Sequence, residues 1–370
     1  MLGKPSKCDG VMRILRNRLM RGAYEGKLPS VRALAVELGT NPNTVQIALA
    51  QLEALQMVRR VPRQGTFAVP LGRSPNSPGL VYARLVFPVR SPPPGYPHEF
   101  WASEIIFAFE EAARQKDLTV ALEFTEDVDH AVENAVAEAR CPGCVGTCLL
   151  SMPLQPRHLV QLSAAGNSLV VADWDVEELV TPLVNFDNHE VGRLAASHLV
   201  QLGHRRIAFT GFQSGAPNQA KRVKGAEDLL RRVGLTLSHR LFCKRTPSEI
   251  IPALVSGPSP PTAVICDYGA GEAEGIIKGL ERAGKHVPEN LSMVAIMSER
   301  PPTSKRSLTG VILDHEAMGR RALEMLLSDS LDESPERVLI PPTLSEPHTS
   351  APPPKPEDRE TKAQGPRPKA

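Results

Sequence analysis

The sequence lacks the features that mark membrane, secreted or disulfide-linked proteins. No apolar run approaches the roughly 20 residues that a membrane-spanning helix needs, so we expect no membrane partner. The first ten residues hold no apolar segment of the kind found in secretory signals. Six cysteines in 370 residues are too few for a disulfide scaffold, and the reducing cytoplasm is therefore the expected compartment.

Known catalytic signatures are missing as well. We find no His-Glu-x-x-His zinc motif, no Gly-x-x-x-x-Gly-Lys-Ser/Thr phosphate loop and no Gly-x-Ser-x-Gly nucleophile turn. Cys141, Cys144 and Cys148 lie close together, as in a zinc knuckle or a redox pair, but zinc needs four ligands and no second Cys/His cluster is near in the sequence. Buried or loop thiols are the favoured interpretation, and we expect no metal, no cofactor and no enzyme activity.

Charge is divided unevenly along the chain. Residues 1–73 contain twelve Lys or Arg and four Asp or Glu, a net charge of +8. The remaining residues contain thirty-one and thirty-seven, a net charge of −6. A small basic domain attached to a mildly acidic body indicates a polyanion as the partner of the small domain.

The basic segment has the pattern of a helix-turn-helix. Apolar residues at helical spacing predict a helix over residues 9–22 and a second one after Ser30, a suitable N-cap. Gly39 suits the positive φ that follows such a helix. Asn41 and Pro42 suit the N-cap and the first position of a third helix.

The third helix and the hairpin after it are the expected DNA-reading elements of a winged helix. The N-terminal end of a recognition helix normally faces base edges, and a basic hairpin reaches phosphates. The strands are expected at residues 58–61 and 66–69, with Arg59, Arg60 and Arg63 supplying charge. The residues expected to contact DNA are Arg32, Asn41, Asn43, Thr44, Gln46, Arg63, Gln64, Gly65 and Thr66. A winged helix used for protein contacts is the alternative, and the +8 charge argues against it.

The stretch LPSVRALAVELGTNPNTVQIALAQLEALQMVRRVPRQGTFAV contains Leu-Pro-Ser-x-Arg-x-Leu-Ala, Thr-Val and Gly-Thr-Phe-x-Val in order. In these elements it resembles the DNA-binding domain of the GntR family over nearly all of residues 9–69, which implies double-stranded operator DNA as a partner. That family often has Ser-Arg before the Thr-Val and Arg after it, whereas this chain has Pro42-Asn43 and Gln46. We therefore expect this helix to bind DNA more weakly, and the wing and the first helix to contribute more of the DNA affinity.

After a linker rich in Pro, Gly and Ser, strands and helices alternate. This order predicts parallel sheets with helices on both faces, and two such halves in succession usually enclose a ligand cleft. Strands are expected at residues 84–89, 120–124, 145–151, 169–172, 206–210, 263–266 and 291–296. Helices are expected at residues 100–115, 132–140, 159–165, 192–202, 221–233, 272–283 and 316–327.

Several motifs of this body belong together. They are VNFDNHEVGRLAASHLVQLGHRRIAFTGF, KRVKGAEDLLRRVGL, GLERAGKHVPENLSMVA and SLTGVILDHEAMGRRALEMLL. In these motifs the body resembles the effector-sensing domain of the LacI repressor family, which is itself similar to periplasmic sugar-binding proteins. The resemblance covers about residues 82–340 and makes His204 a structural turn residue rather than a general base.

Polar residues at expected strand ends are the candidate effector ligands. Asp173 follows a strand, and Trp174 beside it offers a face for stacking on a sugar. The resemblance makes Arg222 a ligand-gripping residue, and its planar fork suits vicinal hydroxyls or a carboxylate. The expected effector-binding residues are Asp173, Trp174, Arg222, Asp267 and Tyr268, with an ordinary loop aspartate and a surface arginine as alternatives. Residues 295–298 replace the family's Gly-Phe-Asp-Asp without an acid, with Glu299 as a substitute, which implies an unusual or a lost ligand.

The expected fold class is α/β, with an N-terminal winged helix-turn-helix and a two-lobed, periplasmic-binding-protein-like sensor. We expect the DNA-binding domain at residues 1–70, a linker at 71–81, the sensor at 82–340 and a disordered Pro-rich tail at 341–370. The tail holds too few apolar residues to offset its chain entropy by burial.

The expected function is a ligand-responsive transcription regulator, a repressor that binds operator DNA as a homodimer and senses a sugar or other small polar effector. In the alternative, the sensor has lost its ligand and serves only for dimerisation. An aminotransferase fused to a GntR-type domain is a rival, but it needs a longer catalytic domain with a Schiff-base lysine. A solute-binding protein is another, and the winged helix argues against it.

Overall fold

The computed structural model divides the chain into two compact units. Unit 1 contains residues 1–91, 102–185 and 315–339, and unit 2 contains residues 92–101, 186–314 and 340–370. The described residues are 7–20, 23–24, 26–69, 81–88, 102–139, 141, 143–163, 168–178, 181–212, 215–243, 247–267, 269–298, 307–328, 335–346 and 348–354. Within them, every helix falls short of the length and apolarity that a membrane crossing requires.

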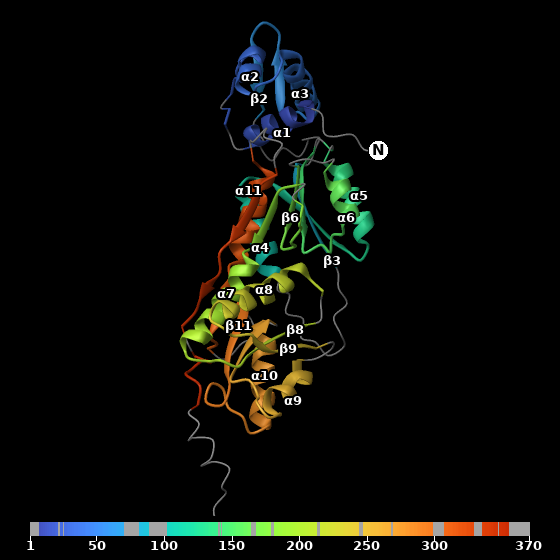
Figure 1. Cartoon of the computed structure of the whole chain (residues 1–370). Coiled ribbons are helices and arrows are strands. Elements are labelled where there is room, and N and C mark those ends of the chain that lie inside the picture. Colours follow the sequence, from blue (N-terminus) through green and yellow to red (C-terminus); the bar gives the residue numbers. More distant parts are fainter. Residues whose placement is uncertain are drawn as a thin grey trace, which may run out of the picture. The chain divides into compact units, whose positions relative to one another are not determined.

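Unit 1 begins with a winged helix-turn-helix, drawn in blue in Figure 1. Its elements are α1 (Lys7–Met20), α2 (Val31–Glu37), α3 (Pro42–Ala54) and the antiparallel strands β1 (Val58–Val61) and β2 (Gly65–Ala68). Ser30 accepts a hydrogen bond from the N–H of Ala33 at 3.2 Å and Asn41 one from Thr44 at 2.8 Å, which confirms both predicted N-caps. Gly39 has the predicted positive φ, +58°. The helices and β1 enclose a core that includes Ile14, Leu15, Leu34, Val45, Leu49, Leu52 and Val58.

The rest of unit 1 is built on a six-stranded sheet in the order β13-β7-β6-β5-β3-β4. Its strands are β3 (Tyr82–Pro88), β4 (Thr119–Thr125), β5 (Cys144–Leu150), β6 (Leu169–Ala172), β7 (Leu183–Phe186) and β13 (Arg337–Ile340). Its helices are α4 (Ser103–Arg114), α5 (Val128–Glu138), α6 (Pro156–Leu162) and α11 (His315–Leu326). Strands β3 to β7 are parallel, so their carboxyl ends share one edge of the sheet.

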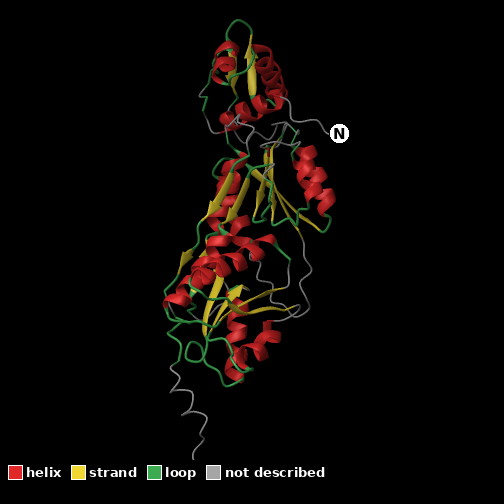
Figure 2. Cartoon of the chain, in the orientation of Figure 1, coloured by secondary structure: helices red, strands yellow, loops and turns green. Residues whose placement is uncertain are grey.

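Unit 2 contains a second six-stranded sheet, in the order β14-β12-β11-β10-β8-β9. Its strands are β8 (Ile207–Phe212), β9 (Leu237–Cys243), β10 (Ala263–Asp267), β11 (Ser292–Ser298), β12 (Gly310–Leu313) and β14 (Thr343–Leu344). Its helices are α7 (Asn188–Gln201), α8 (Pro217–Arg232), η2 (Pro247–Ile250), α9 (Ile251–Val255) and α10 (Ala270–Arg282). All pairs except β12–β14 are parallel, and Figure 2 shows helices on both sides of each sheet. The predicted α/β class is confirmed.

The helix expected at residues 316–327 follows the strands of the second half in the sequence, which suggests that it belongs there, but this assignment is wrong. Helix α11 belongs to unit 1, where its backbone packs directly on α4. A Cβ on Gly319 would lie 2.2 Å from the carbonyl oxygen of Ile105, so only glycine permits this approach. The amphipathic pattern of a helix shows that one face is buried but does not show which sheet it covers.

The prediction of a disordered tail is wrong for the described residues between 341 and 354. Strand β14 pairs with β12, and Thr349 and Ser350 are buried. The Thr349 hydroxyl accepts the N–H of Thr309 and donates to the carbonyl of Met293, both at 2.9 Å. Hydrogen bonds to a sheet order this segment despite its few apolar side chains. Residues 355–370 and most of the predicted linker, residues 71–80, lie outside the described residues.

Candidate nucleic-acid and ligand sites

Helix α3 presents an exposed polar surface over its N-terminal half. Asn43 and Gln46 are exposed, and Val45 between them is buried in the domain core. Thr44 is half-buried because its N–H and its hydroxyl both donate to Asn41 Oδ1, at 2.8 and 3.1 Å. Asn41 therefore uses its side-chain oxygen as a helix cap and keeps its amide N–H groups for a partner. The predicted DNA contacts on α3 thus lie where a recognition helix meets base edges.

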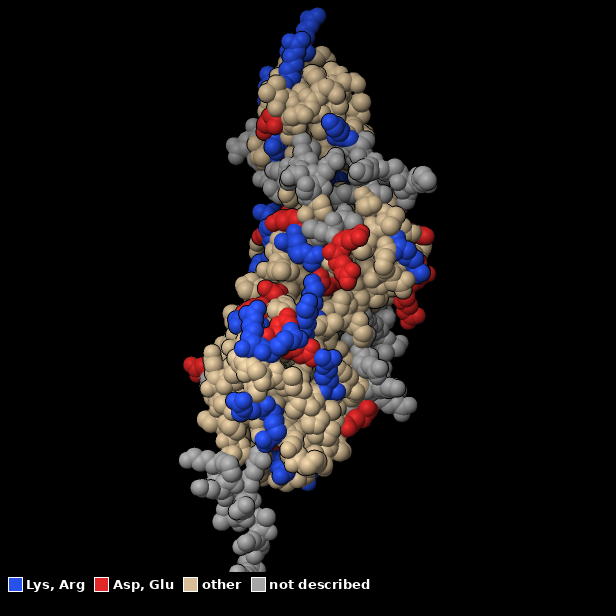
Figure 3. Space-filling view, in the orientation of Figure 1, with Lys and Arg blue, Asp and Glu red and all other residues tan. Residues whose placement is uncertain are grey.

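The β1–β2 hairpin carries a basic tip. Arg63 and Gln64 are exposed, and Arg63 has φ of +62°. Lys27 lies beside this tip, because a Cβ at Gly65 would approach its Cε to 2.9 Å and Lys27 forms a bridge with Phe67. Figure 3 shows Lys and Arg side chains projecting from this end of the domain. Lys27 was not predicted, because it comes from the loop before α2 and no local pattern links that loop to the wing.

Arg60 of the hairpin also contacts the third helix. Its Nη2 donates to the carbonyl of Gln46 at 2.9 Å, and its Nε lies 3.4 Å from the carboxylate of Glu53. Both partners are in α3. Arg60 therefore links the hairpin to α3, while Arg63 and Lys27 lie at the hairpin tip and Arg59 is exposed on β1.

Three arginines of α1 have partners within unit 1: Arg13, Arg16 and Arg18. Arg13 and Arg16 are 6% and 2% exposed, and their guanidinium groups donate to backbone carbonyls of unit 1. Arg18 pairs with Glu37 at 2.6 Å. A buried guanidinium cannot meet a phosphate, so Arg13 and Arg16 stabilise the domain and its attachment rather than a DNA contact.

In unit 2, two predicted effector residues meet in one polar cluster. Arg222 of α8 donates from Nη1 to Oδ1 of Asp267 at 2.6 Å and from Nε to Oδ1 of Asn188 at 2.7 Å. Gln219 donates to the second carboxylate oxygen of Asp267 at 3.3 Å. The side chains of Arg222 and Asp267 are only 15% and 5% exposed. Limited contact with water strengthens this ion pair, and its hydrogen bonds hold the guanidinium in one orientation.

This strand-end cluster suits a hydroxyl-rich ligand. It lies at the carboxyl end of β10, the edge at which parallel sheets bind ligands. A sugar hydroxyl both donates and accepts hydrogen bonds. The cluster offers guanidinium and carboxamide donors beside carboxylate and carboxamide acceptors, so it can satisfy both. Asn188 and Gln219 are the members that sequence reasoning missed, although Asn188 stands in the quoted Asp-Asn motif. Tyr268 and Glu299 lie outside the described residues, so their predicted roles stay predictions.

In unit 1, Asp173 forms a second strand-end pair. Ser151 follows β5 and Asp173 follows β6, and the Ser151 hydroxyl donates to Oδ2 of Asp173 at 2.7 Å. Both residues have positive φ, +50° and +52°, a conformation that residues other than glycine seldom adopt. Strain of this kind persists where surrounding structure enforces it, often at functional sites. Trp174 is half-buried and packs on the apolar cluster that includes Leu149 and Val176.

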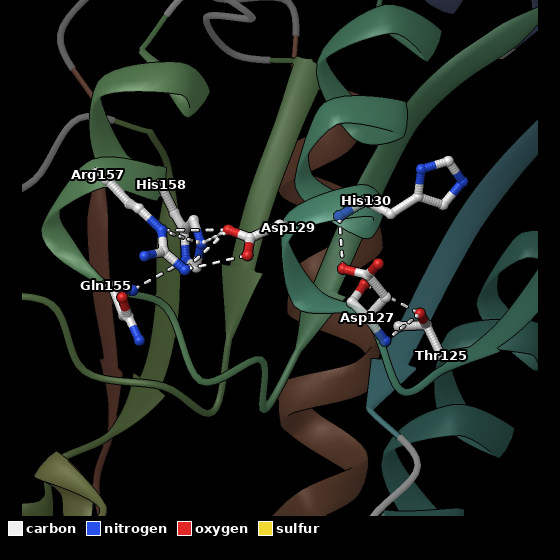
Figure 4. Close-up of polar contacts among 7 residues, drawn as sticks. All are labelled: Thr125, Asp127, Asp129, His130, Gln155, Arg157 and His158. Carbon is white, nitrogen blue, oxygen red and sulfur yellow. Dashed lines mark hydrogen bonds and ion pairs between the residues drawn. The ribbon is translucent and has the colours of Figure 1, made fainter.

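A third polar cluster joins α5 and α6 of unit 1 (Figure 4). Nε2 of His158 lies 2.7 Å from Oδ1 of Asp129, and its Nδ1 accepts the N–H of Gln155 at 3.0 Å. Arg157 pairs with the same carboxylate at 3.0 Å, while His130 points away from it. The hydrogen bond from His158 lowers the pKa of the Asp129 carboxyl. Nδ1 of the buried histidine thus caps α6 and Nε2 links it to the first turn of α5, and a structural role accounts for the pair.

The other reactive side chains considered from the sequence are also accounted for. His204 is 1% exposed, with Nδ1 2.9 Å from the hydroxyl of Thr262 and Nε2 2.8 Å from the carbonyl of Ala351. Cys141, Cys144 and Cys148 are free thiols. Among the described residues no group of three or more His, Cys, Asp or Glu is arranged to hold a metal ion.

Two family descriptions match separate parts of the chain. Residues 8–68 match "Bacterial regulatory proteins, gntR family", and this range runs from α1 to the end of β2. Residues 196–350 match "Periplasmic binding protein-like domain".

Solved structures share the fold of the body. A LacI transcriptional regulator from a Rhodococcus species has a TM-score of 0.61 and 23% identity, covering 74% of this chain and 100% of its own. A LacI family transcriptional regulator from Enterococcus faecium, solved with bound ribose, has a TM-score of 0.59 and 20% identity, covering 73% of this chain and 99% of its own. The chain thus joins a domain similar to the gntR family of bacterial regulatory proteins to a body similar to periplasmic binding protein-like domains, with the fold seen in LacI-family structures.

Curated relatives match this chain over part of its length. The HTH-type transcriptional repressor PurR of Photobacterium profundum is 23% identical over 175 residues, 46% of this chain and 52% of the relative. The HTH-type transcriptional repressor CytR of Escherichia coli K12 is 28% identical over 165 residues, 43% of this chain and 48% of the relative. The chain therefore spans about half the length of the curated relatives it matches.

Proposed function

We propose that this chain is a ligand-responsive, DNA-binding transcription regulator, a repressor without enzymatic activity. Its GntR-type domain binds double-stranded operator DNA through the N-terminal half of α3 and the wing. Its LacI-like body binds a sugar or another small polar effector. Two copies act as a homodimer in the cytoplasm, where each copy reads one half-site of the operator.

One observation carries the proposal. A single chain combines an exposed recognition helix with the cluster of Arg222, Asp267 and Asn188 at a strand end. The first feature is of use to a protein that reads DNA, and the second to one that binds a polar molecule. The repressor names of PurR and CytR and the ribose in the Enterococcus faecium structure support this combination in related folds.

Coupling between the two sites follows from linkage. An effector that binds one arrangement of the body more tightly than another shifts the population toward that arrangement. If the two arrangements differ in how they place the DNA-binding domains of a dimer, the effector changes the free energy of DNA binding. By linkage, DNA changes the free energy of effector binding by the same amount. A coupling of about 1–3 kcal/mol corresponds to a 5- to 150-fold change in affinity.

The DNA half of the proposal is tested by selection of binding sites from a random duplex library with the full chain. The expected result is an enriched sequence with two related half-sites, bound with an affinity that falls steeply as salt rises. Binding that shows no sequence preference and no salt dependence would refute it.

The effector half is tested by titration calorimetry of the full chain with pentoses, hexoses and nucleosides. A ligand is expected to bind and to change the affinity for the selected DNA. The alternative of a body that only dimerises predicts no heat with any of these compounds and no change in DNA affinity. The intact ion pair and hydrogen bonds around Arg222 favour a body that still binds.

A further inference from the structure

Three polar side chains of α1 attach the winged helix domain to the rest of unit 1. Arg13 Nη1, Arg16 Nη2 and Asn17 Nδ2 donate to the backbone carbonyls of Ser328, Val145 and Leu326, at 2.6, 3.1 and 3.4 Å. All three donors are at least nine-tenths buried. Two of the acceptors stand at the C-terminal end of α11, where carbonyls have no partner within the helix. The third acceptor lies in β5.

The acceptor in β5 exists because this strand contains a bulge. Tyr82 of β3 pairs with Cys144, but the next residue, Ala83, pairs with Gly146. Val145 is therefore the extra residue on the bulged strand, and a bulged residue stands outside the ladder of hydrogen bonds. Its carbonyl accepts the hydrogen bond from Arg16 instead, so the geometry of the bulge decides how Arg16 is held.

Two thiols lie directly before this bulge. The N–H of Cys144 donates to the carbonyl of Cys141 at 3.1 Å, the hydrogen bond of a β-turn, in which the outer Cα atoms lie within about 7 Å. Disulfides form at Cα separations of about 4.4–6.8 Å. Cys141 is half-buried, with Sγ 4.0 Å from the Tyr82 hydroxyl, while Cys144 is buried, with Sγ 3.5 Å from the Gly146 carbonyl. The pair thus has one partly exposed thiol, on Cys141, and one buried thiol, on Cys144.

The guanidinium of Arg16 is electrostatically coupled to both thiols. Burial lowers the pKa of Arg16 to about 10, and negative charge on Cys144 and Cys141 opposes this effect. Burial raises the pKa of the Cys144 thiol, and the charge of Arg16 opposes that rise in turn. Cys141 is the thiol that a dissolved oxidant reaches, whereas the buried Cys144 thiol is protected.

We propose that Cys141 and Cys144 form a reversible disulfide and that its formation loosens the attachment of α1 at Val145. A hydroperoxide transfers one oxygen atom to the Cys141 sulfur, which becomes a sulfenic acid while the peroxide leaves as an alcohol or water. The Cys144 sulfur then attacks the sulfenic sulfur, the S–S bond forms and water leaves. Two electrons pass from the two thiols to the O–O bond. A small thiol restores both cysteines by exchange.

The disulfide acts on Arg16 through the backbone. It holds the two Cβ atoms about 3.8 Å apart, which moves Cys144 and with it the bulge that presents the Val145 carbonyl. Arg13 and Asn17 bond to carbonyls at the end of α11, so oxidation weakens one of three attachment points and loosens α1 without detaching it.

The test uses the full chain, treated with hydrogen peroxide or kept reduced, and two measurements without DNA. Peptide mapping is expected to find a Cys141–Cys144 disulfide, with loss of two of the six alkylatable thiols. Hydrogen–deuterium exchange of α1 is expected to be several-fold faster after oxidation. Cys141→Ser and Cys144→Ser should each abolish both effects. Cys8→Ser, which removes the half-buried thiol on α1 itself, is the matched control and should retain both.

Three outcomes would overturn the proposal: no disulfide between these residues, a disulfide that leaves α1 exchange unchanged, or faster exchange that persists in Cys141→Ser. The Cys141→Ser variant keeps the test decisive if Cys144→Ser fails to fold, since Cys141 is only half-buried. Because neither measurement involves DNA, failure here and failure of the proposed regulator function are separate results.

Discussion

Gly192 of α7 and Gly225 of α8 lie where the two helices meet through their backbones. A Cβ at Gly192 would lie 1.7 Å from the carbonyl oxygen of Arg222, and one at Gly225 would lie 1.9 Å from that of His189. Neither position has room for a side chain. The same close approach brings the Arg222 side chain within 2.7 Å of Asn188 on α7, so the strand-end cluster depends on this crossing.

The first prediction concerns this crossing. Gly192→Ala forces the helices apart, because the added methyl meets a backbone carbonyl that cannot rotate away. Overpacking of this kind typically costs about 1–3 kcal/mol of stability. We expect urea unfolding to show a loss of that size, and calorimetry to show weaker effector binding because Arg222 moves away from Asn188.

Gly275→Ala on α10 is the matched control. Gly275 is exposed, and no atom lies within 4 Å of its Cβ position. Alanine there should leave stability unchanged or raise it by about 0.5–1 kcal/mol, since glycine is the poorer helix former. An equal loss of stability in both variants would show that the close approach is not the cause.

The second prediction concerns Arg222 itself. Arg222→Ala removes two charged hydrogen bonds and leaves Asp267, 5% exposed, without its cation. We expect loss of effector binding and a decrease of about 1.5–3 kcal/mol in the free energy of unfolding. Arg222→Lys keeps the charge but not the planar fork, so it should recover part of the stability and little of the binding.

Arg231→Ala tests whether any arginine on α8 has this effect. Arg231 pairs with Asp228 at 2.7 Å, but its side chain is 72% exposed, so water competes with the pair. The expected change in stability is within about 0.5 kcal/mol, and effector binding should be unaffected. Equal loss of binding in Arg222→Ala and Arg231→Ala would place the effector elsewhere.

The winged helix domain was predictable because its signals are local. Ser30 and Asn41 act within three residues of their own position, and the positive φ of Gly39 needs no distant partner. Strand β6 has the predicted bounds because a parallel strand that is buried on both faces appears in the sequence as a short run of apolar residues. Strands β9 and β13, which are only partly buried, were missed, and so were β7 and β12, which are buried but short.

The polar clusters were predictable only residue by residue. Arg222 and Asp267 were named separately, but their contact joins positions 45 residues apart and depends on how α8 packs beside β10. Ser151 carried no signal, because its role comes from a positive φ and from the strand that ends beside it. The burial of Arg13 and Arg16 could not be foreseen either, since the sequence shows their charge and not the carbonyls that they face.

The third prediction concerns the wing. Arg63→Ala should weaken DNA binding about equally for all sequences and lower the slope of log affinity against log salt by about 1, as expected for one lost phosphate contact. Gln46→Ala on α3 should instead relax sequence preference with little change in the slope. Fluorescence anisotropy over a salt series measures both. Arg240→Ala, in a partly exposed pair with Glu227 on unit 2, is the control, and a reduced slope there would contradict the proposed role of the wing.

The fourth prediction concerns pH and the ordered C-terminal segment. His204 and His198 bind this segment through Ala351 and Ser350, at 2.8 and 2.7 Å. Burial lowers the pKa of both histidines below the ordinary value of about 6.5. Below pH 6.5 the unfolded chain therefore binds more protons than the folded one, and stability falls as the pH falls through this window. Above pH 7 both states are neutral at these positions and the contribution is constant.

Urea unfolding over a pH series measures this loss, and limited proteolysis should cut first within the segment that includes Ala351. His204→Gln, which keeps hydrogen-bonding capacity without a titrating ring, should flatten the decrease between about pH 6.5 and 5. Carboxyl groups such as Asp129 have their pKa lowered by hydrogen bonds, so they lose stability only in more acidic solution and do not mask this window. A wild-type decrease that begins only below about pH 4, or one that His204→Gln leaves unchanged, would show that His204 does not control it.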